Sequence, residues 1–347
     1  EPDFPVPECV SAETLDALER HETSYTHSLG GIRLREAISR WHKDKYGTDV
    51  APDRILVTSG TSPAMLLFFS AFVNPGDEII LSDPHYACYP NFIRFARGIP
   101  VTVPVYEEEG FQYTTAGIRE KISDRTKGVF INSPSNPTGN VMSGQRMKKI
   151  ADLCREKGIP LISDEIYHGL VYEGKEHSIL EFTDNAFVFN GFSKLFAMTG
   201  LRLGYIIAPK PHIRTLQVLH QNFFICANSI TQSCGARALQ ESGEETEKMK
   251  ETYNERRKYM IKRLREMGLG ITVEPTGAFY VFANAKHVSE DSFALALDIL
   301  EKQHVGVTPG IGFGANGEGY LRFSYANSLE NIKKGMDRLE PYFSKRL

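Results

Sequence analysis

The strongest constraint on the fold of this 347-residue chain is a regular alternation of two patterns that begins at Arg54. Short apolar runs are separated by segments of roughly 10 to 15 residues with helical spacing. Strands that alternate with helices form a mainly parallel sheet with helices on its faces. We therefore predict an α/β domain with strands at 55–58, 78–82, 101–105, 128–132, 160–164, 186–190 and 205–208.

A long charged segment at 244–267 separates this region from a second, shorter pattern, and its length suits a helix that connects two domains. The sequence predicts a large domain at 13–250 and a smaller α+β domain formed by 251–347 together with 1–12. The large domain is expected to begin with helices at 12–22 and 34–46. In the smaller domain we expect strands near 271–274, 278–282, 305–308 and 320–324, and helices at 291–301 and 329–343.

Charge and hydropathy argue against several classes of partner. A net charge of -3 gives no reason to expect nucleic acid or an anionic membrane surface. No apolar run reaches the roughly 18 residues of a membrane span, and the sequence does not begin with a signal-peptide pattern. The five cysteines have neither metal-type nor redox-type spacing, so they are interpreted as reduced thiols in a cytoplasmic protein, with no metal site.

Two cationic residues follow one another at neighbouring strand ends. Lys194 comes just after the expected strand at 186–190, and Arg202 precedes the strand at 205–208. Ligands of open α/β sheets bind at the edge formed by the carboxyl ends of the strands. A lone lysine and a lone arginine are more often ordinary surface residues, so a functional interpretation depends on other motifs.

The segment 59–63 has the composition of a phosphate-binding helix start. Gly60 allows a sharp turn after the strand at 55–58, and Pro63 is expected as the first helical residue, where the missing N–H costs nothing. Free N–H groups at that helix start, with the hydroxyls of Thr61 and Ser62, would bind a phosphate. An ordinary N-cap is the alternative interpretation.

Five stretches of the chain match one family in the same order: VTSGTSPA at 57–64, SPSNPTG at 133–139, SDEIYHGLVY at 163–172, NGFSKLFAMTGLRLGY at 190–205 and YLRFSYANS at 320–328. Together they resemble the class I and II aminotransferases, which use pyridoxal 5'-phosphate (PLP) on fold type I. The resemblance implies an enzyme that moves an amino group between an L-α-amino acid and a 2-oxo acid by a ping-pong mechanism. It also implies a homodimer.

The resemblance implies a role for each residue around the cofactor ring. Lys194 would carry PLP and act as the base. Asp164 would face the pyridine nitrogen and keep it protonated, because an opposite charge in a poorly solvated site favours the charged form. Asn136 and Tyr167 would contact the phenolic oxygen, and Tyr86 would stack on the ring. The alternatives are a helix N-cap for Asp164, a core aromatic for Tyr86 and a turn residue for Asn136.

A second group of residues is implied for the phosphate. It comprises Gly60, Thr61, Ser62, Ser193 and Arg202. Tyr25 would reach the phosphate of the partner subunit, with packing on its own domain as the alternative. Many members have serine three residues before the lysine, where this chain has Gly191, so one phosphate contact is expected to be lost or replaced.

Arg322 is the candidate for substrate binding, together with Asn136 and Tyr86. It lies on the expected strand at 320–324, which is otherwise mostly apolar. A buried guanidinium needs an anionic partner, and its planar shape suits a carboxylate. The resemblance assigns that role to the substrate α-carboxylate, and a structural salt bridge is the competing interpretation.

Two other functions stay open on the sequence. A PLP-dependent β-eliminating lyase would use the same lysine, and detection of pyruvate and ammonia would identify it. A PLP-sensing regulatory domain would need a basic DNA-binding segment upstream. In the family, a helix and a substrate-contacting glycine precede the EPDF of residues 1–4, so the chain is expected to be a fragment that lacks one cover of the active site. The sequence does not specify the substrate side chain.

Overall fold

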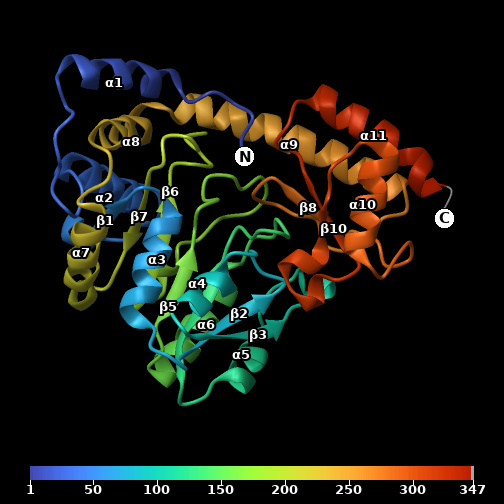
Figure 1. Ribbon diagram of the computed structural model, residues 1–347, viewed down its shortest axis with the longest axis horizontal. Coiled ribbons are helices and arrows are strands. Elements are labelled where there is room, and N and C mark those ends of the chain that lie inside the picture. The colour runs from blue at the N-terminus through green and yellow to red at the C-terminus, as the bar shows by residue number, and fades with distance from the viewer. Residues whose placement is uncertain (345–347) are drawn as a thin grey trace.

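The computed structural model describes residues 1–344, which form two sheets connected by a long helix (Figure 1). The larger sheet has seven strands, of which six run in one direction and β7 runs in the opposite direction. The predicted mainly parallel sheet is therefore confirmed. In spatial order the strands are β1 (Ile55–Thr58), β7 (Gly204–Ile207), β6 (Ala186–Gly191), β5 (Leu161–Asp164), β4 (Thr126–Asn132), β2 (Glu78–Asp83) and β3 (Ile99–Pro104).

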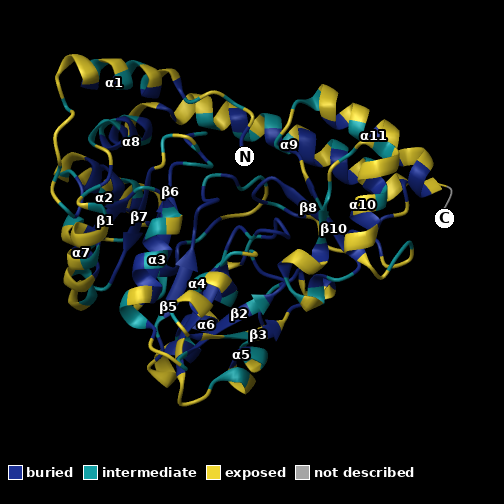
Figure 2. Cartoon of the chain, viewed as in Figure 1, coloured by how far each residue is buried: buried dark blue, intermediate teal, exposed yellow. Residues whose placement is uncertain are grey.

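Both faces of the larger sheet are buried under helices, because alternate side chains of a strand point to opposite faces. In β6, Ala186 and Val188 join one apolar cluster, whereas Phe187 and Phe189 join the other. Figure 2 shows the strands buried, except for the edge strand β3, and the outer faces of the helices exposed. The first cluster includes side chains of α2 (Ile32–Tyr46), α5 (Thr115–Lys121), α6 (Gly144–Lys157) and α8 (Ser229–Glu241); the second includes those of α3 (Thr61–Phe72), α4 (Tyr89–Phe95) and α7 (Lys210–Phe224).

The smaller sheet is antiparallel and has β10 in its centre. The long helix α9 runs from beside α8 to this sheet (Figure 1). There α11 packs against α9, and α10 packs against α11 and the sheet. The α+β character expected for this region is thus present. Its elements are α9 (Gly243–Glu266), β8 (Tyr280–Asn284), α10 (Ser292–Gln303), β9 (Thr308–Pro309), β10 (Tyr320–Ser324) and α11 (Leu329–Ser344).

In the smaller region one predicted strand is absent and two have other bounds than predicted, each for a local reason. No strand forms at 271–274, because the main-chain N–H of Thr272 donates to Oε1 of Glu107 (2.8 Å) instead of to a neighbouring strand. The strand at 278–282 begins only at Tyr280, since Ala278 has φ of 54°, outside the extended region. The strand predicted at 305–308 begins only at Thr308 and ends at Pro309, since proline cannot donate to the ladder.

The first helix, α1 (Glu8–Glu19), begins and ends earlier than predicted. It starts after Pro7 and stops before His21, whose φ of 57° is left-handed. The predicted boundary at residues 12 and 13 falls inside α1, and the boundary at 250 and 251 falls inside α9. The division into domains stays a prediction. Within residues 1–344, no helix combines the length and the apolar character that a membrane crossing requires.

Candidate active site

Most of the predicted site residues lie at one edge of the larger sheet. The six strands that run in one direction, β1 to β6, all end at this edge. Because β7 runs in the opposite direction, it begins there, so a residue that precedes it reaches the same edge. The residues concerned are Gly60 to Ser62 after β1, Tyr86 after β2, Asn136 after β4, Asp164 and Tyr167 at the end of β5, Ser193 and Lys194 after β6, and Arg202 before β7.

The start of α3 and Arg202 form a site for an anion. The helix begins at Thr61 and not at Pro63, so Pro63 occupies the third helical position. Gly60 has φ of 100°, and no side chain caps the free N–H groups of the first turn. A Cβ on Gly60 would lie 2.7 Å from Nη2 of Arg202, so only glycine lets the guanidinium lie against this turn. The helix start and the cation together favour a negative ligand.

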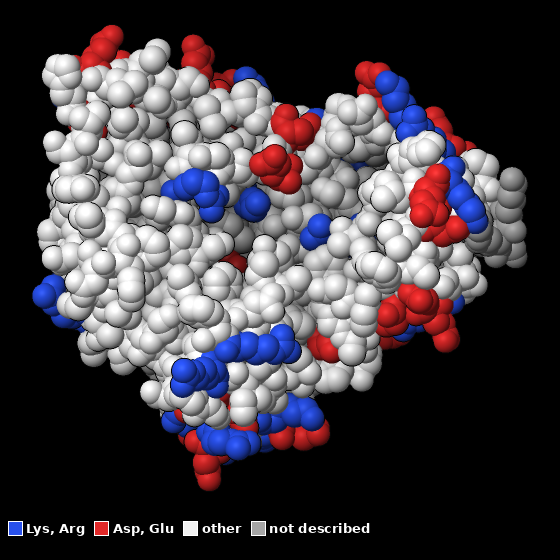
Figure 3. Space-filling view, in the orientation of Figure 1, with Lys and Arg blue, Asp and Glu red and all other residues white. Residues whose placement is uncertain are grey.

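Arg202 is available for that ligand. Its Nη1 donates to the main-chain oxygen of Thr199 (2.8 Å), and it forms no ion pair with any residue of the described chain. Thr61 is half-buried and Ser62 is exposed, so both hydroxyls are accessible. In Figure 3, Lys and Arg side chains stand apart from one another around a hollow near the middle of the face, and most of the surrounding surface is uncharged.

The replacement of serine by Gly191 has a steric reason. A Cβ at Gly191 would lie 2.9 Å from the main-chain oxygen of Leu203 and 3.0 Å from Cα of Gly204. A Cβ on Gly204 would in turn lie 2.7 Å from the main-chain nitrogen of Thr61. The glycines thus let β6, β7 and the start of α3 approach closely. Ser193, which is half-buried, is the hydroxyl nearest in sequence that could replace the missing contact.

Lys194 is half-buried, and its charge is coupled to the other site residues. Burial lowers the pKa of its ammonium group, and the positive charges of Arg202 and Arg322 lower it further. The carboxylates of Glu1 and Asp164 act in the opposite direction. Nζ of Lys194 lies 6.0 Å from the ring centre of Tyr167. A lysine in such surroundings has a larger uncharged fraction at neutral pH than a free lysine, and the uncharged amine is the form that acts as base or nucleophile.

Asp164 is a buried carboxylate that forms no ion pair with any described residue. Its Oδ2 accepts a hydrogen bond from the hydroxyl of Tyr89 (2.7 Å), and its Oδ1 accepts one from the main-chain N–H of Ile166 (3.1 Å). Burial raises its pKa to about 6, and these two hydrogen bonds oppose that rise. No helix follows Asp164, so the N-cap interpretation was wrong.

Arg322 brings the smaller sheet into the site. Its Nη1 donates to Oδ1 of Asn136 (2.8 Å) and its Nη2 to Oγ1 of Thr308 (3.2 Å), while Nε is buried without a partner. The rings of Tyr280 and Phe313 lie 4.4 and 4.9 Å from the guanidinium carbon. No acidic group of residues 1–344 pairs with Arg322, so the salt-bridge interpretation was wrong. The arrangement leaves the guanidinium ready for a carboxylate ligand.

The two tyrosines at the sheet edge are held by other tyrosines. The hydroxyls of Tyr167 and Tyr280 lie 3.0 Å apart, which connects β5 of the larger sheet to β8 of the smaller one. Tyr86 is half-buried and packs edge-on against Tyr89, with ring centres 5.3 Å apart. Tyr25 is 79% exposed in the loop between α1 and α2, and no contact within the described chain joins it to the residues above.

Four residues that the sequence interpretation missed support the site. The hydroxyl of Tyr89 donates a hydrogen bond to Asp164, and the hydroxyl of Tyr280 is hydrogen-bonded to that of Tyr167. Thr308 accepts a hydrogen bond from Arg322. Asn132 accepts the N–H of Asn136 (2.9 Å) and donates to the main-chain oxygen of Asp164 (2.9 Å), so it couples two predicted residues. Only Asn132 had a usable signal in the sequence, since it is a polar residue at the end of an apolar strand.

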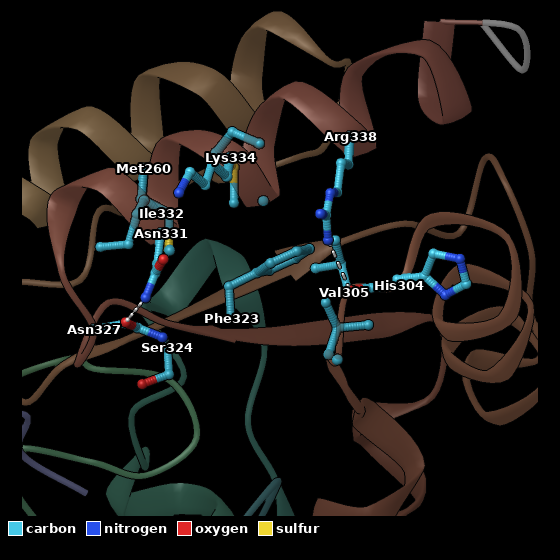
Figure 4. Close-up of a pocket in the computed structure, with 14 residues that line it drawn as sticks. Met260, His304, Val305, Phe323, Ser324, Asn327, Asn331, Ile332, Lys334 and Arg338 are labelled. Atoms are coloured by element: carbon cyan, nitrogen blue, oxygen red, sulfur yellow. Dashed lines mark hydrogen bonds between the residues drawn. The ribbon is translucent and has the colours of Figure 1, made fainter.

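A cavity of about 340 Å³ lies in the smaller region and is separate from this site (Figure 4). Phe323 and Ser324 of β10 line it, whereas the side chain of Arg322 contacts Asn136 of the larger sheet. Two hydrogen bonds lie beside the cavity: Asn331 donates to Asn327 (3.0 Å), and Arg338 donates to the main-chain oxygen of His304 (3.4 Å). None of the predicted site residues lines this cavity.

Comparison with known proteins gives one consistent result. Residues 1–339 match the family described as aminotransferase class I and II. The chain is 41% identical to a (5-formylfuran-3-yl)methyl phosphate transaminase of Methanocaldococcus jannaschii, over 99% of this chain and 90% of that protein. It is 39% identical to an aspartate aminotransferase of Pyrococcus horikoshii, over 98% and 88%. The crystal structure of an aromatic aminotransferase from Pyrococcus horikoshii superposes with a TM-score of 0.96 at 36% identity, over 100% and 94%.

Proposed function

Because the chain belongs to the class I and II aminotransferase family, whose members use PLP, we propose that it binds PLP at the sheet edge described above. In this proposal Lys194 carries the cofactor, and the substrate lies between the two sheets. The observation that supports it most is the grouping of an amine with a lowered pKa, a buried carboxylate and two cations without acidic partners in the described chain.

The residues fit the chemical groups of PLP. Its phosphate suits the uncapped start of α3 and the guanidinium of Arg202, where only glycine fits at position 60. Its pyridine nitrogen suits the Asp164 carboxylate, which is buried without a cation in the described chain. Tyr86 offers an aromatic face, and Asn136 and Tyr167 offer polar groups next to it. Ser193 and the hydroxyls of Thr61 and Ser62 complete the proposed phosphate site.

When bound, PLP supplies an electron-accepting ring, and the protein supplies orientation and proton transfer. Nζ of Lys194 takes the α-proton of the amino acid and later returns a proton, since burial favours its uncharged form. The negative charge of Asp164 would keep the ring nitrogen protonated. Arg322 binds the substrate carboxylate, and its contact with Asn136 aligns the substrate with the larger sheet.

The enzyme is an aminotransferase, as its relatives are named, and none of the three relatives reported above is a lyase. The substrate pair is what remains to be measured. A panel of amino donors with 2-oxoglutarate should yield glutamate together with the matching 2-oxo acid. Release of pyruvate and ammonia without a new amino acid would instead identify a β-eliminating lyase.

The two arginines are expected to divide cofactor binding from substrate binding. Replacement of Arg202 with alanine should weaken PLP retention, because Arg202 lies against the start of α3. Replacement of Arg322 with alanine should raise KM for α-amino acids and leave PLP bound. A charge-assisted hydrogen bond contributes about 1.5 to 3 kcal/mol, so each effect should be roughly tenfold or larger. Dialysis measures the first effect and steady-state kinetics the second.

An amine without a carboxylate is the matched control substrate. Its turnover should barely change in the Arg322→Ala variant, since it offers nothing for the guanidinium to bind. Faster loss of PLP from the Arg322 variant than from the Arg202 variant would reverse the two assignments.

We also propose that the protein is a cytoplasmic homodimer. All five cysteines are free, which suits a reducing compartment. Tyr25 is exposed and so could reach the phosphate site of a partner subunit. Sedimentation analysis would give the assembly state, and a dimer that dissociates should lose PLP more readily.

A further inference from the structure

Tyr89 contacts the carboxylate at the centre of the proposed site, and the sequence motifs do not include it. We propose that Tyr89 is a positioning residue whose hydroxyl keeps Asp164 ionised and fixes the direction of its carboxylate at the sheet edge. The role of Tyr89 in catalysis rests on the proposed function. The hydrogen bond itself can be tested without the reaction.

Packing holds the Tyr89 ring in place. Tyr89 is the first residue of α4 and is 3% exposed. Its ring centre lies 4.2 Å from that of Phe130 on β4 and 5.3 Å from that of Tyr86. β4 pairs with β5, so a ring resting on β4 can reach the end of β5, and the hydroxyl lies 2.7 Å from Oδ2 of Asp164.

The hydroxyl acts as a donor at any pH that the protein meets. Burial raises the pKa of Tyr89 well above its usual value, and the nearby Asp164 charge raises it further. The proton therefore stays on the tyrosine, and a hydrogen bond from it favours the ionised carboxylate over the protonated one. Because Asp164 forms no ion pair within residues 1–344, this hydroxyl and the N–H of Ile166 are its hydrogen-bond donors there.

Other charged and titratable groups also act on Asp164. The negative charge of Glu165 raises its pKa, whereas a positive charge on His168 lowers it. Lys194, after β6, is coupled to the same carboxylate, as are the hydroxyls of Tyr86 and Tyr167. The Tyr89→Phe change leaves all of these groups in place, so a change in the titration of Asp164 reports the lost hydrogen bond.

Tyr89→Phe is the direct test, with Tyr113→Phe as the matched control. Phenylalanine keeps the ring packing on Phe130 and removes only the hydroxyl. Tyr113 is also 3% exposed, and its hydroxyl donates at 2.8 Å to the main-chain oxygen of Phe130, not to a carboxylate. The free energy of unfolding is measured for the full chain freed of PLP, at pH 5 and pH 8.

Loss of the hydrogen bond should raise the pKa of Asp164 by about one to two pH units. A carboxyl group whose pKa is higher in the folded protein than in the unfolded chain lowers the free energy of unfolding once the pH exceeds the pKa of the unfolded chain. The higher the pKa in the folded protein, the larger this loss is at high pH, so the added loss in the variant grows from pH 5 to pH 8. The Tyr89→Phe variant should therefore lose more stability at pH 8 than at pH 5. The loss in Tyr113→Phe should be equal at both values.

The Asp164→Asn background separates this effect from general packing. In the Asp164→Asn background, the Tyr89→Phe change should lower the free energy of unfolding equally at both pH values, because the titrating carboxyl group is gone. In the PLP-loaded enzyme, the acid limb of the kcat/KM profile should move to higher pH by a similar amount. A stability loss in Tyr89→Phe that does not depend on pH would overturn the proposal. If Tyr89→Phe showed the pH-dependent loss but the wild-type protein showed no amino transfer, the proposed function alone would fail.

Discussion

Replacement of Lys194 with alanine is expected to lower the rate of amino transfer by at least about 10³-fold. General acid–base catalysis alone contributes roughly 10² to 10⁴-fold, and the proposed attachment of PLP would be lost as well. The lowered pKa of Lys194 fits it for this role, because an uncharged amine is the form that accepts a proton. Single-turnover measurement of product 2-oxo acid would give the rate.

Lys210 provides the control for this change. It is an exposed lysine at the start of α7 that pairs with Asp53 (3.5 Å), and it follows the end of β7 that points away from the proposed site. Lys210→Ala should retain full activity. If Lys194→Ala kept a rate within about tenfold of wild type, Lys194 could not be the base.

Replacement of Asp164 with asparagine is expected to lower the rate by roughly 10² to 10⁴-fold. Loss of one partner of a buried ion pair costs about 3 to 5 kcal/mol, and about 1.4 kcal/mol in the barrier is tenfold in rate. Asp164→Glu should keep more activity, because it retains a carboxylate. Near-native turnover of the asparagine variant, measured under PLP saturation, would refute the electrostatic role.

Although Asp164→Asn should lose activity, it should gain stability relative to wild type as the pH rises. Burial raises the pKa of Asp164 to about 6, so the folded protein binds this proton more tightly than the unfolded chain. Ionisation of Asp164 therefore costs stability as the pH rises from about 4 to above 6. In the PLP-free protein, the stability of Asp164→Asn relative to wild type should rise between pH 5 and pH 8. A group kept for catalysis at the expense of stability is expected to behave in this way.

The sheet edge could be predicted from the sequence because its geometry follows from strand direction. Residues that come after parallel strands, such as Asn136, Asp164 and Lys194, meet wherever those strands end together. Arg202 reaches the same edge because β7 is reversed, a fact that the strand pattern alone does not reveal. The motif order supplied that placement through the family resemblance.

The supporting residues could not be predicted because they depend on packing between distant elements. Tyr89 reaches Asp164 only because its ring rests on Phe130, and Tyr280 meets Tyr167 only because the two sheets approach each other. The smaller region was also harder to predict. There a left-handed residue, Ala278, and a hydrogen bond from Thr272 to Glu107 override an apolar pattern that is typical of strands.

The central claim is that Lys194 is the residue that carries PLP, and its most direct test is chemical. Protein saturated with PLP is reduced with borohydride, digested and mapped by mass spectrometry. The account predicts a pyridoxyl group on Lys194. A label on another lysine, or no label at all in saturated protein, would contradict it.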